Sequence, residues 1–324
     1  MTTQVASHTF ASLEREWEAL LPDCAVDTIF LTPRWQRVWW ETLGEGEMLL
    51  LAIREGDRLH GIAPMMRHDG TMTFLGDTDL FDYQDFLVPR GSEEAFYPRL
   101  LDHLAAEEWD VLDLPSIRED SPTLQALPEQ ARARGWLCCV EQQDVVPGLE
   151  LPADWEAYLA GLSKKDRHEL RRKFRRLSTA TGLRHYACGD PTGLPACVDD
   201  LFDLMRLGRE EKRDFLSPER QAFFRAMTAE MADAGVLRLY FMEVEGQRVA
   251  ASLCFDYKGQ RLLYNSGFNP DYAHLSVGLL LKATCLREAI EGGAHYYDFL
   301  RGDERYKYHM GGQVRAVYRI KVTR

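Results

Sequence analysis

The chain has 324 residues, of which 45% are hydrophobic and 28% are charged. This length is about twice that of a common single domain, so we expect two domains, each with enough apolar residues for a core. The net charge of −12 argues against DNA as a partner, because phosphate contacts need concentrated positive charge. No basic segment followed by an apolar one opens the chain, and no apolar run is long enough to span a bilayer. We therefore expect a cytoplasmic protein without integral membrane association.

The cysteines give no sign of a metal site. They lie at positions 24, 138, 139, 188, 197, 254 and 285. This spacing matches neither a CxxC framework nor a Cys/His ligand set, so we predict free thiols.

An internal repeat organises the chain. A proline that follows a Thr or Ser N-cap opens a helix at Pro33 and again at Pro218, and 218 − 33 = 185. A pair of strands turns at Gly56 and another pair turns at Gly246, and 246 − 56 = 190. A third strand, a helix and a short strand follow each hairpin. These segments span residues 71–77, 98–108 and 109–115 in the first half, and 261–268, 278–293 and 295–302 in the second.

Each half therefore reads helix, helix, hairpin, strand, helix, strand. A meander followed by a crossover helix and another strand makes a mixed sheet, whose last pair is parallel. The predicted fold class is α/β (mixed α+β), with two mostly antiparallel mixed sheets flanked by helices. Proline and glycine interrupt the pattern in VVPGLELPADW, so we place the domains at residues 1–150 and 151–324.

The segment SKKDRHELRRKFRRL, residues 163–177, carries eight Lys or Arg against two acids. Ser163 and Asp166 resemble a capping box, and an apolar stripe at helical spacing follows, so the segment is predicted to be a helix. The excess of positive charge makes the side chains of this helix repel one another, which favours an anionic ligand that would neutralise them. A solvated helix face is the alternative. The arginines that we predict to bind such a ligand are Arg171, Arg172 and Arg175.

The strand RLLYNSGF leads through NPDYAHLSVG into a helix. A helix N-terminus offers unsatisfied N–H groups and the positive end of a dipole, and Gly278 lets an anion approach closely. These features favour a pyrophosphate, whereas the plain alternative is Ser276 as an ordinary N-cap. The predicted contacts are Ser276, Val277, Gly278 and Leu279.

The order of elements in residues 236–300 resembles the GNAT acyltransferase superfamily, with AHLSVGLLL where the pyrophosphate loop of that superfamily lies. That loop has the pattern Gln/Arg-x-x-Gly-x-Gly/Ala, and of the aligned Ala273, Ser276 and Gly278 only the last fits. Over nearly the whole chain, two GNAT-like halves with LSKKDRHELRRKFRRL, GFNPDYAHLSVGLLL and YDFLRGDERYK resemble the BioF2-like or CelD/BcsL-type acetyltransferases. This family is related to the Fem-type aminoacyl ligases.

The resemblance implies an N-acyltransferase with acyl-CoA, in the first place acetyl-CoA, as co-substrate and no metal. The acceptor would be an amine of a small metabolite, a sugar or a cell-envelope precursor. Backbone N–H groups from Tyr264 onward, including Asn265, would face the acyl carbonyl.

Amide formation also needs a base for the amine and an acid for the leaving group. Asp298 and Glu304 are the candidate bases, Tyr306 is the candidate acid, and Lys307 is a candidate for holding a substrate carboxylate or phosphate. The repeat gives Asp298 a second interpretation, because Asp113 occupies the equivalent position without such a motif after it. An acid at this strand end could stabilise the fold in both halves rather than take part in catalysis.

In the first half, FLGDTDLFDYQDFLV replaces the phosphate loop, and its acids would repel a pyrophosphate. Asp79, Asp82 and Asp85 are spaced by three, but no calcium-loop pattern accompanies them, so we expect no metal here. We predict that the first half has lost donor binding and contributes acceptor contacts through Tyr83 and Asp85.

Two other functions remain open. One is a Fem-type transferase that takes its aminoacyl group from charged tRNA and uses the basic helix on phosphates. The other is a noncatalytic binding protein that has kept the fold.

Overall fold

The computed structural model describes residues 3–208 and 210–324. The chain forms two compact units, residues 1–145 with 315–324, and residues 146–314. The expected boundary at residue 150 therefore differs by a few residues, because β7 (Gly148–Glu150) pairs with β12 of the second unit. The expectation that the last residues belong to the second half is wrong, because β13 (Ala316–Thr323) pairs with β5 and β6 of the first unit.

Unit 1 is a seven-stranded sheet with the order β1-β2-β3-β4-β5-β13-β6. Its strands and helices, besides β13, are β1 (Thr3–His8), α1 (Phe10–Leu20), α2 (Pro33–Leu43), β2 (Glu47–Glu55), β3 (Arg58–His68), β4 (Thr71–Phe74), α3 (Glu93–Ala106), β5 (Val111–Arg118), α4 (Thr123–Ala133) and β6 (Leu137–Val145). Short 3₁₀ turns lie at Leu21–Asp23 and Ile29–Leu31.

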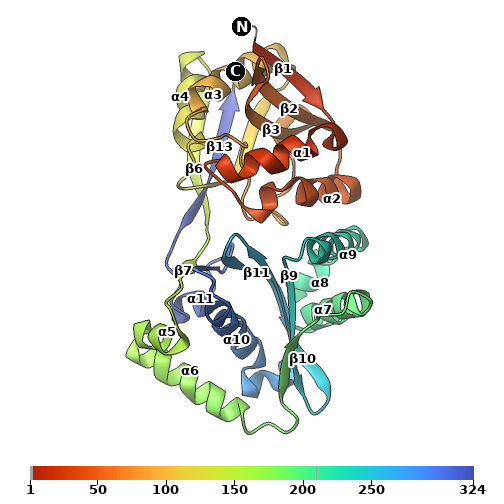
Figure 1. The fold of residues 1–324 in the computed structure, drawn as a ribbon, viewed down its shortest axis with the longest axis vertical. Helices are drawn as coiled ribbons and strands as arrows, with labels where there is room; N and C mark the ends of the chain where they lie inside the picture. The colour runs from red at the N-terminus through yellow and green to blue at the C-terminus, as the bar shows by residue number, and fades with distance from the viewer. Residues whose placement is uncertain (1–2, 209) are drawn as a thin grey trace. The chain divides into compact units, whose positions relative to one another are not determined.

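Unit 2 is a six-stranded sheet with the order β7-β12-β11-β10-β9-β8. Its elements after β7 are α5 (Trp155–Gly161), α6 (Lys164–Leu177), β8 (Arg184–Ala187), α7 (Leu194–Gly208), α8 (Glu210–Phe215), α9 (Pro218–Asp233), β9 (Leu237–Val244), β10 (Gln247–Tyr257), β11 (Gln260–Phe268), a 3₁₀ turn η3 (Pro270–Leu275), α10 (Val277–Glu291), β12 (Tyr296–Asp298) and α11 (Arg305–His309). Figure 1 shows α7 and α9 on one side of this sheet and α10 on the other.

The predicted repeat is confirmed by the strand pairing. In unit 1 the meander β2-β3-β4 is antiparallel, and α3 connects β4 to a parallel β5. In unit 2 the meander β9-β10-β11 is antiparallel, and α10 connects β11 to a parallel β12. Both hairpins turn through a glycine at positive φ, +59° at Gly56 and +79° at Gly246, which a side chain would strain.

The basic helix also forms as predicted. The Ser163 hydroxyl accepts the backbone N–H of Asp166 at 3.1 Å and thereby caps the first turn of α6. Leu170 and Leu177 are buried, and Phe174 packs against the same core. This apolar stripe fixes which face of α6 meets α10 and α11.

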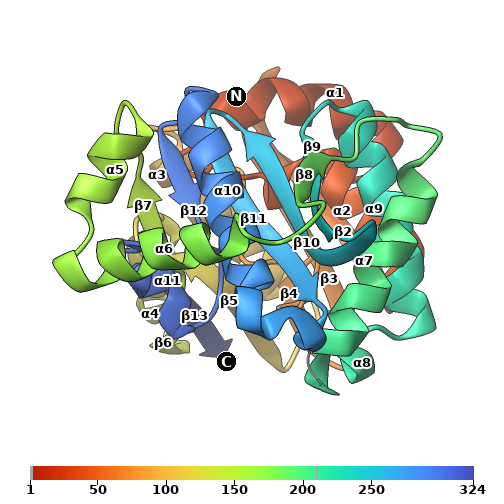
Figure 2. The ribbon, with the colours of Figure 1, turned by 90° about the horizontal axis from the view of Figure 1, so that it is seen from below.

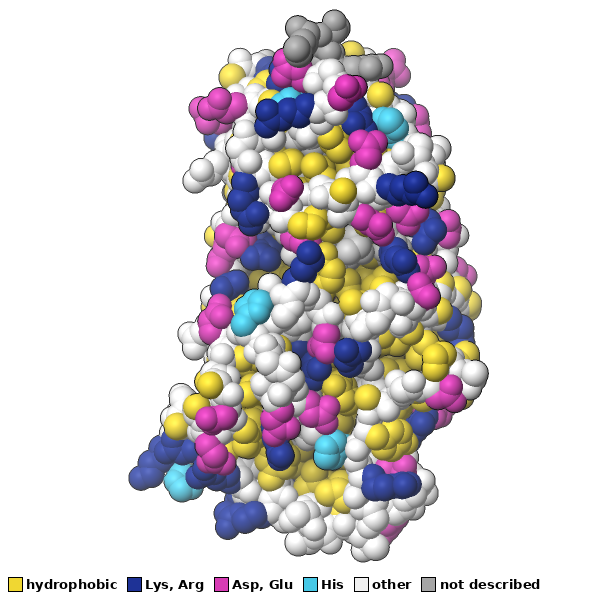
Figure 3. Space-filling view, viewed as in Figure 1, with side chains coloured by type: hydrophobic (Ala, Val, Ile, Leu, Met, Phe, Trp, Pro, Cys, Tyr) yellow, Lys and Arg dark blue, Asp and Glu magenta, His cyan; other side chains and the backbone are white. Residues whose placement is uncertain are grey.

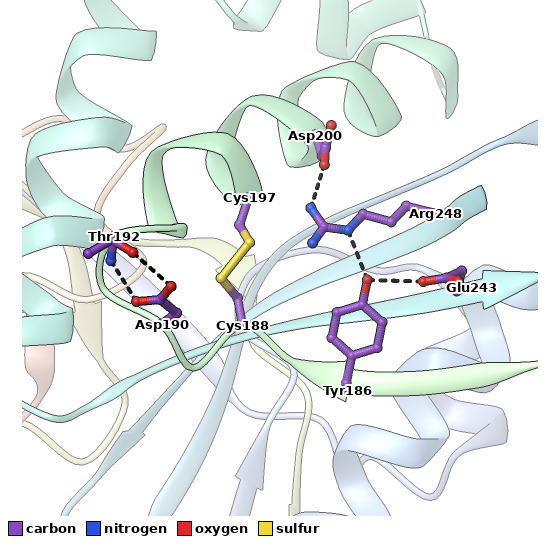
Figure 4. Close-up of a disulfide and its surroundings, with 8 residues drawn as sticks. All are labelled: Tyr186, Cys188, Asp190, Thr192, Cys197, Asp200, Glu243 and Arg248. Atoms are coloured by element: carbon purple, nitrogen blue, oxygen red, sulfur yellow. Dashed lines mark hydrogen bonds and ion pairs between the residues drawn. A yellow bond between two sulfur atoms is a disulfide. The ribbon is translucent and has the colours of Figure 1, made fainter. Parts of the chain in front are cut away.

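The expectation of free thiols is wrong for two cysteines. Cys188, just after β8, forms a disulfide with Cys197 of α7, as Figure 4 shows. The nine-residue separation is no recognisable motif, and the pairing arises because β8 ends beside the start of α7. Cys24, Cys138, Cys139, Cys254 and Cys285 are free.

Candidate active site

Strand β11 separates from its parallel neighbour early in its course. Only Gln260 to Leu262 pair with β12, whereas β11 continues to Phe268. Opposite Leu253 and Cys254 of β10, the pairing register shifts and skips Tyr264. Such a bulge bends a strand and redirects its backbone groups. The N–H groups from Tyr264 to Gly267 therefore belong to a bent stretch of β11 that extends beyond β12.

The side chains of Tyr264 and Asn265 lie on the face of the sheet that is covered by α8 and α9, opposite to α10. The Tyr264 ring lies 5.9 Å from Phe224 of α9 and 5.5 Å from Phe255, between ring centroids. Asn265 Oδ1 accepts a hydrogen bond from Lys212 of α8 at 2.7 Å. Contact of these two residues with a donor would thus involve their backbone, and that contact stays a prediction.

The predicted phosphate-binding residues all lie at the start of α10. Ser276 adopts the left-handed conformation (φ 59°) between η3 and α10 and provides no side-chain cap for the helix. The first-turn N–H groups of Val277, Gly278 and Leu279 have no intrahelical acceptor and point along the helix axis. A methyl group at Gly278 would approach Phe268 to 3.1 Å, so this turn packs closely on the end of β11.

A cavity of about 300 Å³ opens at this helix start. It is lined by Lys173 of α6, by residues of η3 and the first turns of α10, and by Tyr306 of α11. A second cavity of about 300 Å³ shares Lys173, Leu279 and Tyr306 and continues between α6 and α11 toward Met310. Figure 2 shows α6 running alongside α11 and the N-terminal end of α10. The predicted Tyr306 and the predicted helix start thus line the same cavity.

Three cations that the sequence analysis did not single out gather here. Arg176 Nη2 donates to Ser276 Oγ at 2.9 Å, while its Nε is shielded from solvent without a hydrogen-bond acceptor. Lys282 is 9% exposed, and its Nζ lies 3.3 Å from the Gly278 carbonyl and 5.2 Å from the centroid of the Tyr306 ring. Lys173 pairs with Glu169 at 3.6 Å. Together with the helix dipole, these charges favour an anion.

The position of Lys173 could be predicted from the spacing of residues along α6. Lys173 follows Leu170 by three residues and precedes Leu177 by four, so it shares the face of the buried stripe. The same spacing places Arg171, Arg172 and Arg175 outside the face of α6 that carries this buried stripe.

The three arginines predicted as ligand contacts do not line either cavity. Arg171 is exposed and pairs with Glu156 at 3.0 Å, and Arg175 is exposed. Arg172 pairs with Glu169 at 2.7 Å, and its hydrogen bond lowers the pKa of that carboxyl to about 2. Figure 3 shows Lys and Arg side chains, in dark blue, gathered at the lower left where Figure 1 has α6. Their role stays a prediction, and it would concern a ligand at the outer face of this helix.

Asp298 lies at the end of β12 and is 4% exposed. Its Oδ1 accepts the backbone N–H of Leu300 at 2.8 Å, and Leu300 has a positive φ of 56°. The carboxylate therefore stabilises the turn after β12, which favours its architectural interpretation. Asp113, its counterpart in the repeat, forms a bidentate ion pair with Arg319 of β13.

The side chain of Lys307 is hydrogen-bonded to the loop between β12 and α11. Its ammonium is 2% exposed and donates to the carbonyls of Leu300, Arg301 and Gly302 at 2.9, 2.6 and 3.1 Å. It also lies 3.0 Å from Glu304 Oε2. Lys307 thus fixes the loop, and the predicted contact with a substrate would require it to give up these bonds.

The predicted acceptor residues of the first half are buried in unit 1. The Asp85 carboxyl is 2% exposed, and its Oδ1 accepts from the Thr123 hydroxyl and from the Phe86 N–H. Burial raises the pKa of Asp85 to about 6, against the effect of its hydrogen bonds. The Tyr83 ring packs 6.0 Å from Phe30. An acceptor would reach these side chains only if the segment moved.

Two further features concern the described residues 3–208 and 210–324 as a whole. No helix among them is long and apolar enough to cross a bilayer. No group of three His, Cys, Asp or Glu side chains in this part of the chain lies close enough to hold a metal ion.

The family profile described as acetyltransferase (GNAT) domain matches residues 164–308. This segment runs from α6 into α11 and includes every residue that lines the cavity at the start of α10. Residues 164–308 therefore resemble a GNAT acetyltransferase domain, and this match over 145 of the 324 residues supports an acyltransferase.

Solved structures share the complete two-unit fold. The crystal structure of FemX matches with a TM-score of 0.66 and 12% identity, over 98% of this chain and 96% of FemX. A conserved protein of unknown function from Bacteroides thetaiotaomicron matches with a TM-score of 0.62 and 12% identity, over the full length of both chains. A tandem GNAT protein from the clavulanic acid biosynthesis pathway matches with a TM-score of 0.53 and 11% identity, over 98% of each chain. The predicted tandem GNAT-like fold is thus confirmed. No curated protein sequence matches the chain significantly.

Proposed function

We propose that the protein transfers an acyl group from acyl-CoA, in the first place acetyl-CoA, to an amine of a small metabolite, a sugar or a cell-envelope precursor. The observation that carries this proposal is the cavity at the start of α10, where first-turn N–H groups, Lys173 and Lys282 surround one space. Arg176 reaches the same helix start through Ser276. This combination suits a diphosphate.

The chemistry follows from the elements around the cavity. With the diphosphate at α10, the thioester carbonyl would lie at the bulge of β11, where backbone N–H groups from Tyr264 onward can stabilise the developing oxyanion. The neutral amine attacks the carbonyl carbon, a C–N bond forms, and the C–S bond breaks. Tyr306, which lines both cavities, would protonate the departing thiolate. Asp298 or Glu304 would take the proton of the amine, directly or through water.

The donor site is tested at Gly278. Gly278→Asp brings a negative charge to the helix start and should weaken acetyl-CoA binding by at least about tenfold, which is 1.4 kcal/mol. Gly278→Ala is the matched control, because it introduces the same contact with Phe268 without the charge. Binding is measured by calorimetry, and the folded state of each variant by its thermal midpoint. Equal affinities of the two folded variants for acetyl-CoA would remove this site from consideration.

The proton-transfer groups are tested with an identified acceptor. Tyr306→Phe removes only a hydroxyl, and loss of an acid–base group costs roughly 100-fold to 10,000-fold in turnover. Asp298→Asn and Glu304→Gln test the two bases in the same way. Full activity in all three variants would mean that none of these residues transfers a proton.

A second donor is favoured by one observation. The outer face of α6 exposes Arg171, Arg172 and Arg175, and a polyanion needs such a surface more than a small nucleotide does. If the donor is an aminoacyl-tRNA, charged tRNA should support transfer where acetyl-CoA does not. A side-by-side donor assay separates the two functions.

A further inference from the structure

Lys212 of α8 makes an unusual contact with β11. Its ammonium donates to Asn265 Oδ1 at 2.7 Å and to the Ser266 carbonyl at 2.5 Å. Both acceptors lie immediately after the bulge at Tyr264, on the stretch of β11 that extends beyond β12. An amine of this protein's own chain is thus bound at the strand where the acyl carbonyl is proposed to lie.

The two acceptors are held in place without the lysine. The Ser266 N–H donates to Asn265 Oδ1 at 2.9 Å, which fixes the orientation of the amide and presents its oxygen rather than its nitrogen. At Gly267, a methyl group would lie 2.4 Å from backbone atoms of α7, so the helix packs directly on this part of the strand. The pair of oxygens is therefore preorganised, which is what a binding site requires.

The occupant is less constrained than the acceptors. α8 has six residues, too few to be stable as a helix by itself. Lys212 is half-buried, and its four-carbon side chain can rotate away without movement of the helix.

We propose that Asn265 Oδ1 and the Ser266 carbonyl form the site for the primary amine of the acceptor, and that Lys212 fills this site in the free protein. The proposal rests on the proposed function, because it assigns the amine side of that reaction. The amine binds as an ammonium through these two oxygens, displaces Lys212, and then gives a proton to the base of the proposed reaction, Asp298 or Glu304, directly or through water, before it attacks the acyl carbon.

The test is amine binding by Lys212 variants, with n-butylamine as the probe and n-butanol as its uncharged match. If the lysine fills the site about nine-tenths of the time, its removal should tighten butylamine binding about tenfold. We therefore expect Lys212→Met, and equally Lys212→Ala, to bind butylamine more tightly than the wild type, as measured by NMR titration. Lys212→Arg keeps a cation with donors and should show no gain, and butanol should show none with any variant.

Asn265→Leu in the Lys212→Met background should abolish the gain. Equal butylamine affinity in the wild type and in both neutral variants would overturn the proposal and leave Lys212 as a brace between α8 and β11. Acetyl-CoA binding is measured on the same samples. If acetyl-CoA fails to bind while butylamine binding responds as expected, the donor assignment fails and the amine site stands.

Discussion

Substitution of Lys282 should reveal whether the cavity at α10 binds phosphate. Lys282→Met keeps most of the side-chain volume but removes the charge from a group that is 91% buried and lines the cavity. A hydrogen bond from a charged group is worth about 1.5–3 kcal/mol. CoA affinity should therefore fall by roughly 12-fold to 150-fold, since each 1.4 kcal/mol is a factor of ten.

Arg171→Met is the matched control on the other face of α6. The Arg171 side chain is 50% exposed and pairs with a Glu156 side chain that is 74% exposed. Exposed pairs contribute at most about 1 kcal/mol, so CoA affinity should change by less than about fivefold. Both variants are titrated with CoA by calorimetry at low salt and at about 1 M salt, where the Debye length falls to about 3 Å.

The loss in Lys282→Met should persist at high salt because the contact is buried, whereas any loss in Arg171→Met should disappear. A thermal midpoint close to that of the wild type shows that each variant is folded. Equal CoA affinities for the two variants at both salt concentrations would refute the assignment of the cavity and return attention to the outer face of α6.

Three further outcomes concern stability. The pKa of Asp85 is raised to about 6, so the folded state holds a proton that the unfolded state has lost between about pH 4 and pH 6, and stability falls as pH rises through this window. Asp85→Asn removes this dependence. Between pH 4 and pH 7.5, the free energy of unfolding in urea should therefore fall by on the order of 3 kcal/mol more in the wild type than in Asp85→Asn. Parallel pH profiles of the two proteins would contradict this. Asp113→Asn breaks the ion pair with Arg319 and should cost about 1–3 kcal/mol of unfolding free energy in urea titrations, and no cost would show that the pair is dispensable. Cys188→Ser opens the loop closed by the bond to Cys197, and chain entropy predicts a loss of about 2.5 kcal/mol relative to the oxidised wild type; an identical loss under reducing conditions would mean that packing rather than the bond is responsible.

The sequence predicted the repeat because its signals are local. Pro33 and Pro218 open helices at equivalent positions, and Gly56 and Gly246 permit the two hairpin turns. Each signal concerns backbone conformation within a few residues, so the order β2-β3-β4-β5 in unit 1 and β9-β10-β11-β12 in unit 2 followed, whereas the places of β1, β6, β7, β8 and β13 did not. The start of α10 was found in the same way, because unsatisfied N–H groups at a helix N-terminus are a property of any helix.

The site was predicted only in part, because a residue type does not specify a side chain's environment. Nothing in YDFLRGDERYK shows that Lys307 donates to three carbonyls of the loop between β12 and α11 or that Asp298 accepts a turn N–H. Tyr306, five residues after Arg301 in the same motif, does line the cavity. Nothing in the motif distinguishes these residues before the loop is folded.

The sequence by itself determined the tandem α/β architecture, the basic helix α6 and the position of the helix start at Ser276, since caps, turns and periodicity act over a few residues. Tertiary structure alone decided that β13 completes the first sheet, because strand pairing between residues 113 and 321 leaves no local pattern. It also decided which cations meet at the cavity, because Lys173 and Lys282 are 109 residues apart (282 − 173 = 109) and come together only when α6 packs against α10. Long-range packing brings such charges together, and no short stretch of sequence encodes it.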